Sequence, residues 1–177
     1  VRLFGQSGDP LAEITAILAE YRGLDELHII SHGRSGALVF GDTVFDNTTL
    51  NTHQSELQAW STSLASGSDI LLYGCEVGSN DGQIFLQHLQ GLTGSDIAAS
   101  SNNTGSSALG GDANLEVHIG DVSSSSVLSQ DLMDRLALML DTTPPAAAST
   151  RIALSGTSLA ITVTLTESVA SSTDLAN

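Results

Sequence analysis

Two stretches decide the fold that this sequence predicts: LHIISHG at residues 27–33 and DILLYGC at residues 69–75. Each is a compact apolar run that stops at a glycine next to a histidine or a cysteine. Continuous apolar runs are typical of strands covered on both faces, whereas alternating runs are typical of half-exposed strands. Helical patterns of about a dozen residues lie between such strands, which indicates βαβ units. We therefore expect an α/β fold with a mainly parallel sheet and helices on both of its faces.

The rest of the first four-fifths of the chain follows the same alternation. Asp9 and Pro10 are residue types that begin a helix, as N-cap and first helical residue, and Gly23 ends it. The apolar periodicity predicts further helices at residues 54–65, 81–93 and 130–140, further strands at 97–100 and 115–119, and a short hairpin over 36–45.

The composition changes after residue 140. Residues 141–150, DTTPPAAAST, have the composition of a linker. Beyond them, residues 159–165 alternate between large apolar side chains and Ala or Thr, which is typical of a half-exposed antiparallel strand. We expect an α/β domain over residues 1–140 with a truncated first strand, the linker 141–150, and a truncated β segment over 151–177 that starts a β-sandwich. The chain is then a segment of a longer protein.

The charge balance excludes some partners. Five basic residues, all arginine, stand against twenty acidic ones, for a net charge of −15. Such a surface repels phosphate backbones and anionic lipid, so we expect no nucleic-acid partner. No apolar run is long enough for a membrane span. The acidity fits a secreted, cell-surface or calcium-rich setting.

His32 and Cys75 are the candidate catalytic pair. In a parallel sheet, chemistry sits beyond the carboxyl ends of the strands, and each of these residues follows a predicted strand. A cysteine nucleophile needs a base such as imidazole within reach. It also needs N–H donors for the oxyanion, and the backbones of Gly33 and Cys75 are the natural candidates. Cys75 is the single cysteine, so it has no partner in this chain for a disulfide.

These residues carry a resemblance to a known family. The block SHGRSG at residues 31–36 is similar to the Ser-His-Gly-x-x-Gly block of caspase-like cysteine peptidases, and residues 70–78 resemble their apolar strand ending in cysteine. Residues 1–140 as a whole resemble caspase-like domains near the N-termini of very large bacterial surface proteins, which are adhesin-like or carry calcium-binding repeats. The tail from residue 141 resembles the entry to a bacterial immunoglobulin-like (Ig-like) repeat.

The resemblance implies a caspase-like three-layer sandwich and peptide-bond hydrolysis, with Cys75 as nucleophile and His32 as general base and acid. Ser100 and Ser101 would border the substrate pocket. Tyr73 stands where related peptidases often place Asp or Gln, so the substrate preference stays open. The implied function is a secreted or cell-surface cysteine endopeptidase acting on a polypeptide, with its own chain as a candidate substrate. The alternative is a catalytically silent cap or interaction module of an adhesin.

No cofactor is expected from the motifs. The histidines and the cysteine form no ligand pair such as CxxC or HxxxH on one element. His28 and His32 are four residues apart, but on a strand-to-turn segment where we expect them to point to opposite surroundings, so no metal site is predicted. Calcium is compatible with the acidic composition, but neither an EF-hand nor a nonapeptide repeat indicates it.

Overall fold

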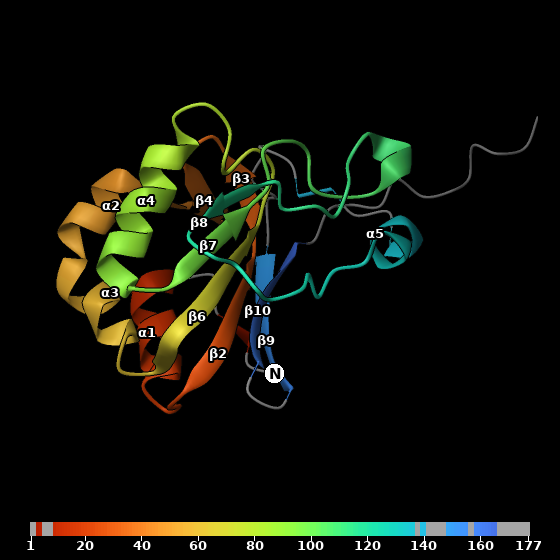
Figure 1. Ribbon diagram of the computed structural model, residues 1–177. Helices are drawn as coiled ribbons and strands as arrows, with labels where there is room; N and C mark the ends of the chain where they lie inside the picture. Colours follow the sequence, from red (N-terminus) through yellow and green to blue (C-terminus); the bar gives the residue numbers. More distant parts are fainter. Residues whose placement is uncertain (1–2, 5–8, 137–138, 141–147, 156–157, 166–177) are drawn as a thin grey trace, which may run out of the picture.

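The computed structural model describes residues 3–4, 9–136, 139–140, 148–155 and 158–165 (Figure 1). Its centre is a mixed sheet in which neighbouring strands follow the order β1-β9-β10-β2-β6-β7-β8. Strands β10, β2, β6 and β7 run parallel to one another, and the outer pairs are antiparallel. The expected α/β class with a mostly parallel sheet is therefore confirmed. The bounds are β1 Leu3–Phe4, β2 Leu24–Ile30, β6 Leu64–Tyr73, β7 Asp96–Ala99, β8 Val117–Ile119, β9 Ala148–Ser155 and β10 Ser158–Leu165.

A small antiparallel sheet follows β2 directly. It contains β3 (His32–Arg34), β4 (Ala37–Phe40) and β5 (Thr43–Phe45), in that order. The hairpin expected over residues 36–45 is present as β4 and β5, and β3 adds a strand that begins at His32. The histidine of the candidate pair thus stands where the chain leaves the large sheet and enters the small one.

The helices are α1 (Pro10–Leu18), α2 (Asn47–Thr52), α3 (Gln54–Trp60), α4 (Gly82–Thr93) and α5 (Gln130–Leu136). The Asp9 carboxylate caps α1 as expected, because its Oδ1 accepts the N–H groups of Leu11 and Ala12. The helix expected over 54–65 ends at Trp60 instead. Leu64 already pairs with Leu24 of β2, and this pairing decides the local structure against helical periodicity. Within the described ranges, no helix has the length and apolarity that a bilayer crossing requires.

One face of the sheet is covered by helices. Figure 1 shows α1 to α4 together on this side, which we call the helical face. The strands contribute alternate residues to it, and α3 and α4 contribute the large aromatic side chains of Trp60 and Phe85, all fully buried. The strand residues concerned are Leu27, Ile29, Ile70, Leu72, Ile97 and Ala99.

The opposite face, which we call the loop face, has a different cover. A second buried cluster lies here and includes Ile30 and Tyr73 from the strands and Cys75 from the loop after β6, with Met133 and Leu140 from the cover. The connection between β7 and residue 140 supplies that cover, and its only α-helix in the described ranges is the short α5 (Figure 1). The expectation of helices on both faces is thus met fully on the helical face, whereas the loop face has only the short α5 within the described ranges. Most of its cover is a serine-rich loop that forms hydrogen bonds with β6.

The C-terminal strands extend the same sheet. Strand β10 runs parallel beside β2, with Leu159 opposite Leu27 and Ile161 opposite Ile29. Strand β10 covers the strand predicted over residues 159–165 and pairs antiparallel with β9. Strand β9 itself was not predicted, and it takes in residues 148–150 of the expected linker. A separate Ig-like sandwich over 151–177 stays a prediction, and residues 166–177 lie outside the described ranges.

Candidate functional site

His32 and Cys75 follow neighbouring strands at the same edge of the sheet. Strands β2 and β6 pair in parallel up to Ile30 and Tyr73. The Ser31 N–H then donates to the Tyr73 carbonyl oxygen at 2.9 Å. His32 and Cys75 each stand two positions beyond the last register pair, so the register brings together the two segments that the sequence singled out.

The backbones of these two segments touch. A Cβ atom at Gly33 would lie 2.6 Å from Cγ2 of Val77 and 2.8 Å from the carbonyl oxygen of Cys75. Neither distance is compatible with a side chain, so only glycine fits between His32 and the cysteine loop. This packing is a reason for glycine at position 33 that does not depend on the oxyanion role predicted for its N–H.

The Cys75 sulfur is enclosed and held by backbone. Both Cys75 and His32 are fully buried. The Thr104 N–H donates to Sγ at 3.3 Å, and Sγ lies 3.7 Å from the Thr104 carbonyl oxygen. An N–H directed at the sulfur is a contact that suits negative charge on that atom. Thr104 therefore belongs to the site, although no motif marked it.

The N–H of Cys75, which the sequence predicts as an oxyanion donor, donates a hydrogen bond to the Leu140 carbonyl oxygen at 3.0 Å. The Leu140 N–H donates in turn to the Thr104 carbonyl at 2.8 Å, and Met139 forms an antiparallel bridge with Gly105. Residues 139–140 thus lie against residues 104–105, joined by one bridge and one backbone hydrogen bond, with the Leu140 carbonyl on the Cys75 N–H.

The chain turns sharply after Cys75. Glu76 has a φ of 61°, in the left-handed region that residues other than glycine rarely adopt. Its N–H donates to the Asn102 carbonyl at 2.7 Å, and the Gly78 N–H donates to the Ser100 carbonyl at 2.8 Å. Strain of this kind is common at functional sites and is held by surrounding contacts. Here it fixes the loop that leaves the cysteine against residues 100–102.

The three residues predicted to border the substrate pocket, Tyr73, Ser100 and Ser101, differ in burial. Ser100 is buried, and its hydroxyl bonds to Asn102. Ser101 is exposed, and its N–H and hydroxyl bond to Glu116. Tyr73 is fully buried in the same cluster as Cys75 and Leu140. Two of the three, Tyr73 and Ser100, are thus buried near the cysteine loop, whereas Ser101 faces outward.

Tyr73 forms a buried polar chain with His28. Its ring stacks on the imidazole with centroids 5.9 Å apart, its hydroxyl lies 3.0 Å from Nδ1, and the Val127 N–H donates to that hydroxyl at 3.1 Å. Because the hydroxyl oxygen accepts from Val127, its proton is available for Nδ1. We infer that neutral His28 carries its own proton on Nε2, 3.2 Å from the Glu26 carboxylate.

Burial governs the titration of both rings. It lowers the pKa of His28 below its ordinary value of 6.5, against the opposing effect of the Glu26 carboxylate. Burial also raises the pKa of Tyr73, which stays protonated and able to donate. No motif marked His28, and its contact with Tyr73 comes from the pairing of β2 with β6.

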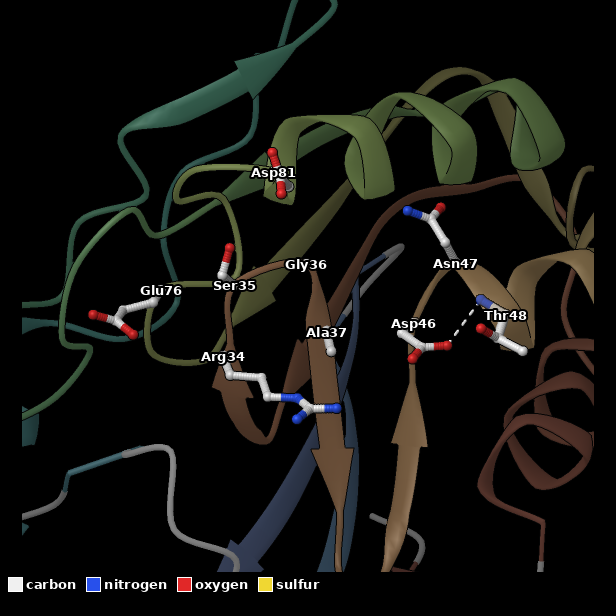
Figure 2. A pocket seen from close by; sticks show the side chains of 9 residues that line it. All are labelled: Arg34, Ser35, Gly36, Ala37, Asp46, Asn47, Thr48, Glu76 and Asp81. Carbon is white, nitrogen blue, oxygen red and sulfur yellow. Dashed lines mark hydrogen bonds between the residues drawn. The ribbon is translucent and has the colours of Figure 1, made fainter.

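An open pocket of about 460 Å³ lies beside the candidate pair. Figure 2 shows its lining, in which the Arg34 guanidinium and the Glu76 carboxylate point in opposite directions. Within the described part of the chain Arg34 has no ion pair, while Asp46 caps α2 through the N–H groups of Thr48 and Thr49. The pocket borders the residues that follow His32 and Cys75. Its lining is Arg34, Ser35, Gly36, Ala37, Asp46, Asn47, Thr48, Glu76 and Asp81.

One group of side chains has the composition of a metal site. Ligand atoms of Asp9, His53 and Glu56 lie within 4.8 Å of one another. They lie around the starts of α1 and α3, where Asp9 already caps α1 and His53 contacts Glu56. We assign no ion to this group.

The family comparison covers the domain that contains all of these residues. No curated protein and no solved structure matches the chain. A family model described as a domain of unknown function, DUF4347, matches residues 1–140. The match ends at Leu140, whose carbonyl accepts the Cys75 N–H. The chain therefore belongs to the DUF4347 family.

Proposed function

We propose that this domain is a cysteine endopeptidase in which Cys75 is the nucleophile and His32 is the general base and acid. The observation that carries the proposal is the β2–β6 register, which puts both residues two positions beyond Ile30 and Tyr73 at one sheet edge. The contact between the backbone of Gly33 and that of the Cys75 loop keeps the two segments adjacent. We also propose that the domain has the three-layer sandwich fold of caspase-like peptidases.

The proposed reaction is hydrolysis of a peptide bond. His32 takes the thiol proton as Sγ attacks the scissile carbonyl, and it returns the proton to the leaving amine. The Cys75 N–H stabilises the oxyanion, and its bond to the Leu140 carbonyl supports this role because that donor faces a carbonyl oxygen. Gly33 remains the proposed second donor. Tyr73 and Ser100 are proposed to wall the substrate pocket, with Ser101 at its rim.

The alternative is a silent cap or interaction module of a large surface protein. The full burial of His32 and Cys75 favours this alternative, because an enzyme acting on other polypeptides must expose its nucleophile. For either function we propose a secreted or cell-surface setting, which the net charge of −15 supports.

Thiol reactivity separates the two functions. Cys75 is the single cysteine, so all labelling by iodoacetamide reports on this sulfur. For the endopeptidase we expect labelling of the folded chain to slow by about 10²-fold in His32→Ala, because the base is lost. The matched control is His118→Ala, which removes an exposed histidine of β8 and should leave the rate unchanged.

The outcome that would favour the silent module is equally definite. Labelling at the same rate in the original chain and in His32→Ala would mean that the imidazole does not activate the sulfur. Circular dichroism of each variant would establish that the comparison is between folded proteins.

A further inference from the structure

Residues 139–140 make backbone contacts at the candidate nucleophile of the kind that a peptide substrate would make. The Leu140 carbonyl accepts the Cys75 N–H at 3.0 Å, which is the bond that the scissile carbonyl of a substrate makes in an oxyanion hole. That N–H and the attacking sulfur belong to one residue. The carbonyl of Leu140 is thus held by the backbone of the proposed nucleophile.

The contacts on the other side of Leu140 are those of a bound peptide. Its N–H donates to the Thr104 carbonyl at 2.8 Å, and Met139 bridges Gly105 in antiparallel fashion. Peptides that bind by adding a strand to an exposed edge make backbone bonds of this kind. The edge that receives residues 139–140 also donates the Thr104 N–H to Sγ, so peptide binding and the nucleophile share one segment.

The Leu140 side chain fills an apolar site. It is 2% exposed and belongs to the buried cluster that also contains Tyr73, Ala98 and Met133. A pocket of this composition selects a medium-sized apolar side chain and rejects a charged one, because burying an unpaired charge is costly. The buried cluster therefore has the properties of a specificity pocket that is filled by the chain itself.

We propose that the peptide bond between Leu140 and Asp141 is this domain's own substrate, cleaved within one chain. The inference rests on the proposed endopeptidase function and names its substrate. It also fits the burial of Cys75, since the segment to be cut bonds the Cys75 N–H and Leu140 belongs to the same buried cluster. Holding the carbonyl in place makes the attack unimolecular, which is the most favourable case for a buried nucleophile.

The steps balance with one water molecule. The Cys75 thiol proton passes to His32 while Sγ bonds to the Leu140 carbonyl carbon. The bond from that carbon to the Asp141 nitrogen breaks, and the amine leaves with the proton from His32. Water then attacks the thioester and gives a proton to His32. The C–S bond breaks to release the Leu140 carboxyl group, and the sulfur recovers its proton.

The experiment uses the full chain of 177 residues. After purification and overnight incubation, intact-mass spectrometry should find one product ending in Leu140 and one beginning with Asp141. Cys75→Ala should stay whole. Leu140→Asp should also stay whole, whereas Leu140→Met, which keeps an apolar side chain, should still be cleaved and serves as the folded reference.

A second measurement separates failure of this inference from failure of the endopeptidase. The probe is the chloromethyl ketone of the tripeptide Leu-Met-Leu, which copies residues 138–140. It should label Cys75 of Leu140→Asp in a reaction that His32→Ala, introduced into the same variant, abolishes. An uncleaved chain, or cleavage at another bond, combined with such labelling would overturn the inference and leave the endopeptidase standing. An uncleaved chain without such labelling would overturn both.

Discussion

The two faces of the central sheet are stabilised in different ways. On the helical face, α1 to α4 pack aliphatic and aromatic side chains against Leu27, Ile29, Ile70 and Leu72. On the loop face, β6 holds its cover through polar groups: the Asp69 carboxylate accepts from Ser123 and Ser124, and the Tyr73 hydroxyl accepts from Val127. Packing is collective and non-directional, whereas each hydrogen bond depends on one geometry.

The difference has a functional consequence. Cys75 belongs to the apolar cluster of the loop face, whose cover is mostly loop and is held by individual hydrogen bonds in addition to that packing. A cover of this kind can open or be exchanged locally while the helical face stays folded. We expect the helical face to determine global stability, and the loop face to determine access to the sulfur.

Removing an aromatic ring from the helical face should have the largest effect. Phe85 of α4 is fully buried and meets Phe45 edge to face, with ring centroids 5.8 Å apart. Phe85→Ala should lower the free energy of unfolding by about 3–5 kcal/mol, measured by urea denaturation. The adjacent Ile84→Ala is the control, because that side chain is 60% exposed and should cost less than about 0.5 kcal/mol. A similar loss in both variants would contradict the view that buried side-chain packing on the helical face determines global stability.

Loss of one carboxylate should loosen the loop face with a smaller global effect. Asp69→Asn should cost about 1–3 kcal/mol, because backbone N–H groups lose a charged acceptor. Hydrogen exchange at Ser123 and Ser124 should accelerate. Asp96→Asn alters the register partner of Asp69 in β7, which bonds Gln90 instead, and should leave those two amides unchanged. Exchange that accelerates equally across α4 would show that the two faces unfold as one.

The same carboxylate predicts a pH dependence. Burial alone would raise the pKa of Asp69, but the hydrogen bonds from Ser124 and Ser123 outweigh it and lower the pKa below the ordinary value of 3.8. The stability that Asp69 contributes is then present above pH 3.8 and is lost as the pH falls through the lower folded pKa. Acid titration of unfolding should show this loss in the original chain, and Asp69→Asn should lack it.

His28 should produce the smallest effect, at milder pH. Its pKa is lowered by burial, so the unfolded chain binds a proton more readily than the folded chain. Stability should therefore fall as the pH falls below 6.5, and His28→Phe should remove this part of the slope. Tyr73→Phe is the matched control: it should cost about 1 kcal/mol for the lost hydroxyl but keep the slope, because His28 still titrates. An unchanged slope in His28→Phe would place the sensitivity on another group.

Much of the helical face could be predicted from the sequence alone. The apolar runs at 27–30 and 70–73, the Asp9-Pro10 helix start and the glycines after the strands are local signals, and they identified β2, β6, α1 and the edge that carries His32 and Cys75. Helix α2 was missed because it is short, and the end of α3 was placed too late because Leu64 pairs with β2.

The sequence by itself indicated the cores of β2, β6, β7 and β10 and the two residues that follow β2 and β6, because hydrophobic periodicity and glycine positions are local properties of the sequence. Only the tertiary structure decided which residues contact Cys75, namely Thr104 and Leu140. The bonds of Leu140 with Cys75 and Thr104 join backbone groups that are distant along the chain, and backbone N–H and carbonyl groups are the same in every residue type apart from proline. No local pattern could therefore reveal that residues 139–140 cover the candidate nucleophile.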